Sequence, residues 1–320
     1  MSVTQDRIVQ DEHKRAVARA KSKKLLNTIL IYAFLVLVLV FAVFPFLWTL
    51  AISFTDKSAT GGVSIYDFPG SLMPRQITIA NFIEVFTQLK IAQPFWNSVV
   101  ISLFTVVGTL IVSALAAYPL ARMDFPGRNI LFGAIIATLV LPTETAFIVN
   151  TMTLKNLANL PVIGGNNCFA PSSVAPYVCQ GLGTYWSVVL PTIATGFGIF
   201  LLRQSYLSIP QALLEAARID GATETQILWR IMIPLSMPAM TALGIFTLVN
   251  TWNAYVWPKI ALLGAQNLEP MSIAVLKLKG QYNFDPFNIA AGAVIMMVPI
   301  LIVFLSAQKL FLRGLDGAVK

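Results

Sequence analysis

The chain has 320 residues, of which 57% are hydrophobic and 11% charged, and its mean hydropathy is +0.74. An ordinary soluble domain has roughly 25% charged residues, so this composition excludes the soluble globular class and indicates a protein of the bilayer. The formal net charge of +8 does not call for a nucleic-acid partner, because basic residues that flank membrane spans meet anionic lipid headgroups.

Apolar segments of about 20 residues are long enough to cross a hydrocarbon core about 30 Å thick as helices. The sequence predicts an all-α polytopic membrane protein with six such helices. Their predicted ranges are 25–54, 98–120, 130–150, 185–202, 239–260 and 289–310. We expect a kink in the fourth span, because Pro191, Gly196 and Gly198 interrupt it.

The first predicted span follows a basic segment, residues 11–24. No small-residue cleavage site follows a short apolar stretch, so we interpret this span as an anchor and not as a signal peptide. Residues 1–24 are interpreted as a cytoplasmic tail whose charges orient the protein. A helix that lies on the membrane surface is the alternative.

Lysine and arginine are distributed unevenly between the two sides of the predicted membrane. With the N-terminus inside, the inner segments hold fifteen of the twenty-two basic residues and the outer segments hold seven. The positive-inside rule therefore places both termini in the cytoplasm, together with the polar segment 208–226.

Several kinds of catalytic site are absent from the sequence. No phosphate-binding loop of the form G-x-x-x-x-G-K-[ST] occurs, so the chain is not expected to bind ATP by that route. His13 is the only histidine and lies in the basic tail, which excludes a His-based metal site and a Ser/His/Asp triad. We therefore predict a non-catalytic subunit that binds no metal or cofactor.

The polar segment 208–226 has the signals of a helix–turn–helix. Pro210 suits a first helical turn, and Gly221 can adopt the left-handed conformation that ends a helix. Thr223 and Gln226 form a capping-box pattern, which predicts that a second helix begins there.

This second helix is predicted to run to about Ile233 and to be ended by Pro234. On the first helix, Ala216 and Ala217 leave a shallow surface that the backbone of another protein could approach closely. Charges available to such a partner are those of Glu215, Arg218 and Asp220.

Residues 215–221 read EAARIDG, and residues 233–238 read IPLSMP. This pattern between apolar spans resembles the EAA motif of permease subunits in binding-protein-dependent ABC importers. The resemblance implies a type I importer transmembrane fold, in which this element docks in a cleft of an ATPase subunit and transmits its closure. The residues that would couple to the ATPase are Glu215, Ala216, Ala217, Asp220 and Gly221.

The resemblance extends over most of the chain, which looks most similar to the MalG-type branch of carbohydrate permeases. The further matching stretches are FWNS at 95–98, FLLRQ at 200–204, TWNAYVWP at 251–258 and RGLDGAVK at 313–320. The branch implies a multi-pass protein of the prokaryotic cytoplasmic membrane that imports a sugar, such as maltose, maltodextrin or trehalose, or a related polyol. Its implied partners are a MalF-like second permease subunit, two ATPase subunits that hold ATP and magnesium, and an extracytoplasmic solute-binding protein.

The predicted organisation is a tail over residues 1–24, a permease domain over 25–312 and a cytoplasmic C-terminal tail over 313–320. Within the permease domain, residues 208–234 form the coupling loop. Residues 160–183 depart from the family pattern, because such permeases usually have a short external turn there. This insertion could contact the binding protein or decorate the rim of the permease.

The insertion carries both cysteines of the chain, Cys168 and Cys179. The predicted topology places them outside the cytoplasm, where oxidising conditions preserve disulfides, so they are candidates for a bond. Two unpaired thiols packed as small hydrophobic groups are the alternative.

Polar groups within the predicted spans are candidates for a substrate path. Glu144 lies in the third span, and a continuous helix would place it about 22 Å from Asn129 at the inner end. An ionisable group at that depth fits the wall of a polar cavity, or it simply reaches water at the outer mouth.

The fifth span concentrates aromatic and amide side chains. Aromatic faces can pack on sugar C–H groups and amides can bond sugar hydroxyls, which suggests a carbohydrate path. The alternative is helix–helix packing with an interfacial aromatic belt, which we favour for Trp257. The candidate path residues here are Asn250, Trp252, Asn253 and Tyr255.

Two other classes of membrane protein are alternatives to the importer. An ion-coupled secondary transporter or channel would need no ATPase, but one carboxylate in the spans is a poor ion relay. A structural membrane scaffold would explain docking without a polar path. The sequence favours the importer, because it gives the helix–turn–helix and the polar spans a role.

Overall fold

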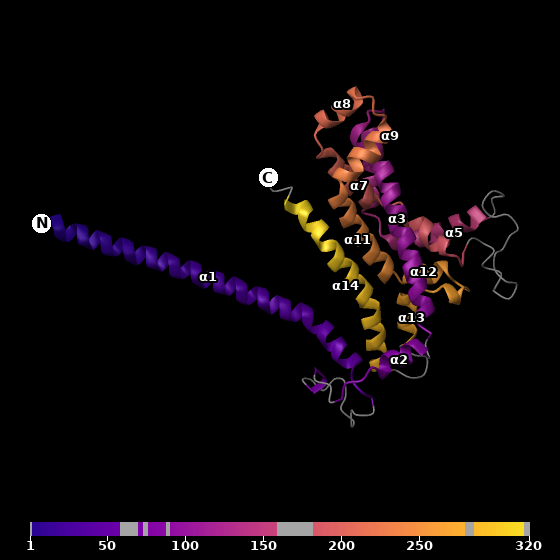
Figure 1. The fold of residues 1–320 in the computed structure, drawn as a ribbon, viewed down its shortest axis with the longest axis horizontal. Helices are drawn as coiled ribbons and strands as arrows, with labels where there is room; N and C mark the ends of the chain where they lie inside the picture. Colours follow the sequence, from indigo (N-terminus) through magenta and orange to yellow (C-terminus); the bar gives the residue numbers. More distant parts are fainter. Residues whose placement is uncertain are drawn as a thin grey trace. The chain divides into compact units, whose positions relative to one another are not determined.

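The computed structural model describes residues 2–57, 70–72, 76–87, 90–158, 182–278 and 285–316. Contacts between Cα atoms divide the chain into two compact units, Met1–Thr78 and Ile79–Lys320. The described elements are all helical (Figure 1). An isolated antiparallel bridge joins Thr55 to Ile77.

The first unit consists mainly of α1 (Ser2–Ser53), which includes the basic segment. From Lys23 to Ser53 this helix is long and apolar enough to cross a membrane. After α1 the chain folds back on the end of the helix, where the indole of Trp48 donates to Ser71 Oγ at 3.1 Å in η1 (Gly70–Leu72). The apolar side chains of α1 are largely exposed, for example Leu37 and Phe41, as expected of a helix surrounded by lipid.

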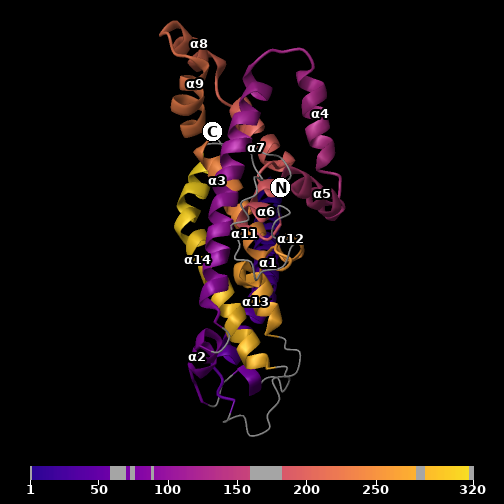
Figure 2. The same ribbon diagram turned by 90° about the vertical axis from the view of Figure 1, so that its right-hand side faces the viewer.

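The second unit is a bundle in which α3 (Ala92–Arg122) packs against α7 (Gly196–Leu207) and α11 (Met237–Asn253), and α11 packs against α14 (Pro286–Asp316). Figures 1 and 2 show α8 and α9 at one end of this bundle and α2 and α13 at the other. The helices of the bundle and its ends are α2 (Ala80–Thr87), α3 (Ala92–Arg122), α7 (Gly196–Leu207), α8 (Gln211–Ile219), α9 (Glu224–Ile227), α11 (Met237–Asn253), α13 (Met271–Lys277) and α14 (Pro286–Asp316).

Small side chains explain the close packing of α3 against its neighbours. Where α7 crosses α3, a Cβ added at Gly198 would lie 2.4 Å from Ser113 Oγ, so only glycine fits there. Membrane helices use such residues because apolar burial alone does not draw helices together in lipid. The buried hydroxyl residues along this face of α3 are Ser98, Ser102, Thr105, Thr109 and Ser113.

The predicted third span, residues 130–150, is wrong as a continuous helix. The chain forms α4 (Arg128–Thr138), a short 3-10 turn η2 (Thr143–Thr145) and α5 (Ala146–Ala158). Pro142 explains the break, because a proline ring clashes with the carbonyl four residues earlier, here that of Thr138, where α4 ends. The depth that we calculated for Glu144 along one helix therefore does not apply.

The fourth predicted span is bent, as expected. Helix α6 (Tyr185–Val189) continues into η4 (Leu190–Thr192), and this segment meets α7 at an angle of 47°. Thr195 caps the new helix by accepting a hydrogen bond from the Gly198 amide. The predicted kink at Pro191 and the glycines is thus confirmed.

The second helix of the polar segment does not end at Pro234, which corrects our expectation. It runs through α9, a π-helical turn η5 (Leu228–Met232) and α10 (Ile233–Leu235), and then meets α11 at 76°. The Ile233 amide donates to Leu228 O, five residues back. This wider turn accommodates Pro234, which lacks the amide donor of a regular helix.

The predicted fifth span, residues 239–260, also breaks. Helix α11 ends at Asn253, Ala254 is extended, and α12 (Val256–Ala261) follows. Pro258 would clash with the Ala254 carbonyl in a continuous helix, which accounts for the break. A 3-10 turn, η6 (Gln266–Leu268), then leads to α13.

By length and composition, three of the described helices could cross a membrane. The number rises to five if each bent pair counts as one span. The predicted third span is not among these, because its apolar helix α4 stops at Thr138. The three unbent candidates are Lys23–Ser53, Ala92–Arg122 and Pro286–Ala307.

Candidate functional site

The most distinctive local structure is the helix–turn–helix of α8 and α9 at one end of the bundle. Its turn depends on Gly221, whose φ of +82° lies in the left-handed region that favours glycine. The Gly221 amide donates to Arg218 O at 3.0 Å and the Ala222 amide to Ala217 O at 2.9 Å. These two bonds form a Schellman motif, which confirms the predicted role of Gly221 in ending the first helix.

The second helix begins with the predicted capping box. Gln226 N donates to Thr223 Oγ1 at 3.3 Å, and Thr223 N donates to Gln226 Oε1 at 2.9 Å. Two amides that a helix start leaves unpaired are satisfied in this way, so the sequence fixes both the end of α8 and the start of α9.

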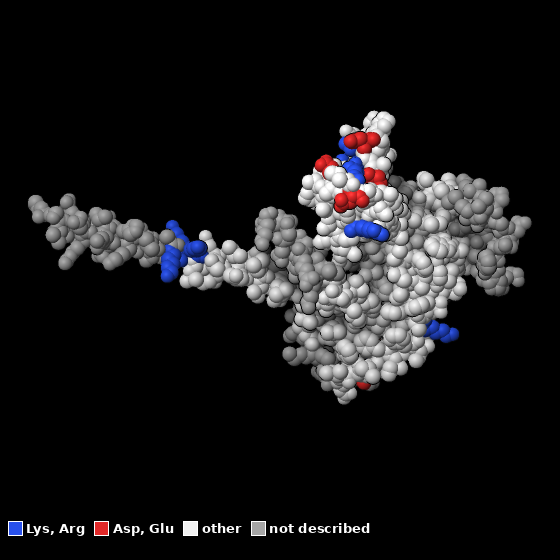
Figure 3. Space-filling model, turned by 45° about the horizontal axis from the view of Figure 1, so that its top comes forward, with Lys and Arg blue, Asp and Glu red and all other residues white. Residues whose placement is uncertain are grey.

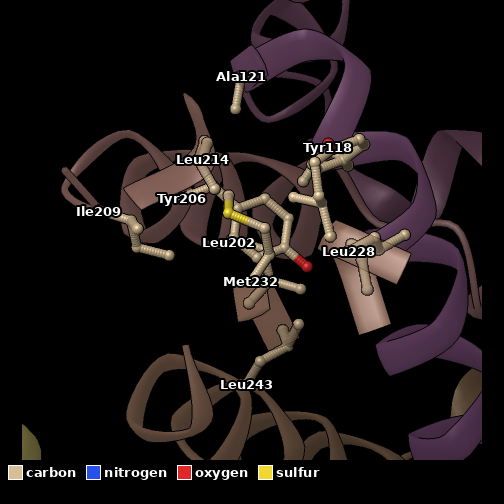
Figure 4. Close-up of a cluster of buried hydrophobic side chains, with 12 residues drawn as sticks. Tyr118, Ala121, Leu202, Tyr206, Ile209, Leu214, Leu228, Met232 and Leu243 are labelled. Atoms are coloured by element: carbon tan, nitrogen blue, oxygen red, sulfur yellow. The ribbon is translucent and has the colours of Figure 1, made fainter. Parts of the chain in front are cut away.

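A buried apolar cluster holds the helix–turn–helix against α3 and α7 (Figure 4). Leu214 is the buried residue of α8 and is 0% exposed, whereas its neighbour Leu213 is 43% exposed. Alanines on α3 leave room for these larger side chains. The buried members of the cluster are Ala114, Ala117, Tyr118, Ala121, Leu202, Tyr206, Ile209, Leu214, Ile227, Leu228, Met232 and Leu243.

Polar contacts surround this cluster. The Tyr118 hydroxyl of α3 donates to Glu224 Oε2 at the start of α9, and Arg218 Nε of α8 donates to Glu224 Oε1 at 2.9 Å. The bond to Glu224 raises the pKa of the Arg218 guanidinium, so this pair remains charged. On the next turn of α3, Arg122 donates to the carbonyls of Tyr206 and Ile209.

The outer face of α8 is charged and exposed. Figure 3 shows acidic and basic side chains gathered over the α8–α9 end, while most of the described bundle surface in that view is uncharged. Of the five residues predicted to couple to an ATPase, Ala217 is partly buried against the apolar cluster. The exposed four are Glu215, Ala216, Asp220 and Gly221.

Sequence reasoning missed one prominent residue of this face. Ile219, at the end of α8, is 87% exposed although it is a large apolar side chain. The sequence carried a signal for it, because Ile219 lies five residues after Leu214 and so off the apolar stripe of the helix.

The predicted path residues of α11 divide into two sets. Asn250 and Asn253 lie on an exposed face together with Phe246, and Asn253 Nδ2 donates to Val249 O at 2.9 Å. Trp252 is buried, since its indole donates to Met296 O at 3.0 Å and its ring meets Phe95 edge-on. The structure therefore groups the two amides and places Trp252 in the contact between α11 and α14.

The remaining candidates occupy separate places. Glu144 is exposed in η2, and Tyr255 is 37% exposed between α11 and α12. Trp257, for which we favoured a packing or interfacial role, is buried and donates to Val188 O at 3.1 Å. The candidate disulfide residues, Cys168 and Cys179, lie outside the described residues.

Metal ligands do not gather anywhere in the described ranges, where no group of three or more His, Cys, Asp or Glu side chains could hold an ion. The helix–turn–helix is suited to binding another protein, because its exposed face is charged and its inner face is packed firmly against the bundle.

Comparison with known proteins places this arrangement in a family. Residues 109–317 match the family model of the binding-protein-dependent transport system inner membrane component. The arabinooligosaccharides transport system permease protein AraQ of Halalkalibacterium halodurans is 32% identical over 94% of this chain and 99% of its own length. The lactose transport system permease protein LacG of Rhizobium radiobacter is 28% identical over 93% of this chain and 98% of its own length.

A crystal structure of a bacterial ABC transporter involved in the import of the acidic polysaccharide alginate has the same fold. Its matching chain superposes with a TM-score of 0.71 at 23% identity, over 89% of this chain and 96% of that chain. The family match covers well over half of this sequence and includes the whole helix–turn–helix. This chain therefore belongs to the binding-protein-dependent transport system inner membrane components, the permease subunits of ABC importers.

Proposed function

We propose that this chain forms half of the translocation path of an ATP-driven importer for a sugar or a related polyol. The names of its relatives support a carbohydrate substrate, because they refer to arabinooligosaccharides and to lactose. An oligosaccharide such as maltose, maltodextrin or trehalose is within this class.

The observation that carries the proposal is the contrast between the two sides of α8. Its inner side is fixed by Leu214 in the apolar cluster, whereas its outer side exposes Glu215, Ile219 and Asp220. A rigid base allows force on the outer face to move the bundle, since packed interiors transmit displacement. We infer that this face is the EAA element and docks in a cleft of a cytoplasmic ATPase subunit.

The proposed assembly has a second permease subunit of the MalF type, two ATPase subunits that bind ATP and magnesium, and an extracytoplasmic solute-binding protein. The excess of basic residues in the sequence segments that the predicted topology groups with residues 208–226 supports a cytoplasmic location for α8, α9 and both termini. We propose that α4 and α5 together form the third span in chain order, broken at Pro142, which brings the number of spans to six. These spans would lie in the cytoplasmic membrane of a prokaryote.

We propose that the substrate path runs along the exposed face of α11 with Asn250 and Asn253. Amides on an otherwise apolar exposed face are costly in lipid, which supports contact with water, sugar or another subunit. Glu144 and Tyr255 are exposed and remain proposed path residues, and Trp252 would support the path from behind through α14.

Mild detergent extraction followed by affinity purification of this chain tests the proposal. We expect a second permease and an ATPase to co-purify, and the associated solute-binding protein to bind a sugar in a ligand screen. Recovery of the chain alone, with ion-dependent uptake, would instead favour a secondary transporter. Recovery of partners without any transported solute would favour a scaffold.

Two variants test the docking face itself. Glu215→Lys reverses the charge of an exposed residue, and Gly221→Pro cannot adopt the left-handed turn, so both are expected to insert normally and to lose sugar uptake while ATP hydrolysis continues. Uptake at the normal rate in both variants would contradict the proposal.

A further inference from the structure

Two side chains one turn apart on α3, Tyr118 and Arg122, reach across to the helix–turn–helix from a different part of the chain. We propose that they form a clasp that makes α3 the helix through which movement of α8 and α9 enters the membrane. This inference rests on the proposed function, because it assumes that the ATPase acts on the helix–turn–helix. Tyr118 and Arg122 are then positioning residues for coupling.

Arg122 holds the chain where it leaves α7 and begins α8. Its Nη2 donates to the carbonyls of Tyr206 and Ile209, and its Nη1 donates to Gln211 Oε1 at 2.9 Å. The last carbonyls of a helix lack partners within the helix and carry partial negative charge, so a cation binds there favourably. The planar guanidinium can hold three oxygens at once, which a lysine cannot do with the same geometry.

Tyr118 holds the helix–turn–helix at the start of α9. Its hydroxyl donates to Glu224, whose second oxygen accepts from Arg218 of α8 at 2.9 Å. The Tyr118 residue is 4% exposed, and its ring meets that of Tyr206 edge-on. The single carboxylate of Glu224 therefore joins α3, α8 and α9.

A reciprocal contact strengthens the attachment of α3 to α7. Arg203 of α7 donates through Nε to Leu120 O at 3.0 Å, on the turn of α3 between the two clasp residues. Its guanidinium also lies 3.9 Å from the centre of the Phe132 ring of α4. The final turns of α3 are thus hydrogen-bonded to α7, α8 and α9.

Because α3 is continuous, it is better suited than α7 or α11 to transmit movement of the helix–turn–helix. The two helices that are continuous with the helix–turn–helix are bent, α7 by 47° against α6 and α11 by 76° against α10. Helix α3 is unbroken over 31 residues, or about 46 Å at the usual rise.

The far end of α3 is also firmly bonded. Asn97 Nδ2 donates to the carbonyls of Asn267 and Glu269, both at 2.9 Å, and Ser98 Oγ accepts from the Met271 amide at 2.8 Å. These contacts explain why the FWNS stretch is polar within an apolar span. Helix α3 therefore links the helix–turn–helix to residues 267–271 at the opposite end of the bundle.

The test measures ATP hydrolysed per sugar transported in the complete importer reconstituted with its binding protein. Tyr118→Phe is the decisive variant, because it removes one hydroxyl and keeps the buried ring, so assembly is expected to be intact. Arg122→Met is the second variant, and Arg128→Met is the matched control, since among the described residues the Arg128 side chain bonds to Asp124 and Met123 beside it. We expect both clasp variants to raise the ATP cost per sugar roughly fivefold or more, and the control to leave it unchanged.

A double-mutant cycle separates coupling from general destabilisation. If Tyr118 acts through Glu224, the combination of Tyr118→Phe with Glu224→Gln should be no worse than the more severe single variant. Additive effects of the two changes would contradict the clasp.

The outcome also distinguishes this inference from the function on which it rests. Normal coupling in Tyr118→Phe, with uncoupling in Gly221→Pro, would overturn the clasp and leave the proposed function in place. Normal coupling in Gly221→Pro as well would overturn both.

Discussion

Leu213 and Leu214 are neighbours with opposite environments, and this difference separates the structural from the exposed side of α8. Leu214 is completely buried among residues of α3, α7 and the π-helical turn, while Leu213 is 43% exposed. The helical period sets this contrast, because consecutive residues point about 100° apart around the axis. Stability and recognition are therefore assigned to different residues of one short helix.

The two leucines provide a matched pair of variants. Leu214→Ala should reduce the free energy of unfolding of the purified chain by about 2–5 kcal/mol, because it leaves a cavity in a packed core. Leu213→Ala should change it by about 0.5 kcal/mol or less, as surface substitutions usually do. Denaturant titration followed by tryptophan fluorescence measures both, and equal losses would show that α8 is not packed as described.

At the scale of the elements, the turn and the helix start of the helix–turn–helix could be predicted from the sequence, but the breaks in the spans could not. The Gly221 turn and the capping box at Thr223 were predictable, because each depends on residues a few positions apart. The breaks at Pro142 and Pro258 were missed, since counting apolar residues ignores the carbonyl four residues before a proline. The clasp was out of reach, because Tyr118 and Glu224 are 106 positions apart.

Asn97 allows the polar end of α3 to be tested. Asn97→Ala removes the donor to Asn267 O and Glu269 O, so it should lower the free energy of unfolding by about 1–3 kcal/mol through unpaired carbonyls. The control is Gln93→Ala, because Gln93 is exposed and its side chain, within the described part of the chain, donates to Asn97 at 3.2 Å and to no carbonyl of residues 267–271. A thermal melt of the purified chain in detergent measures both, and a larger loss in the control would contradict this role for Asn97.

At the scale of the whole molecule, the described surface of the second unit is mainly apolar, and its charge gathers on α8 and α9. Exposed large apolar side chains cover α1 and much of α14, such as Leu35 and Phe304. Lipid or a second permease subunit would cover such apolar surfaces, whereas lipid chains cannot satisfy the charges of α8 and α9. A water-soluble partner suits that end of the bundle, in agreement with the proposed docking of an ATPase.

Site-specific photocrosslinking from position 219 in the native membrane tests the central claim most directly. Ile219 is 87% exposed on the proposed docking face, so a photoreactive residue there should crosslink to the ATPase subunit. The same residue at position 277, at the opposite end of the bundle, should not reach that subunit. Crosslinks from position 219 to lipid or to the solute-binding protein, with none to an ATPase, would contradict the account.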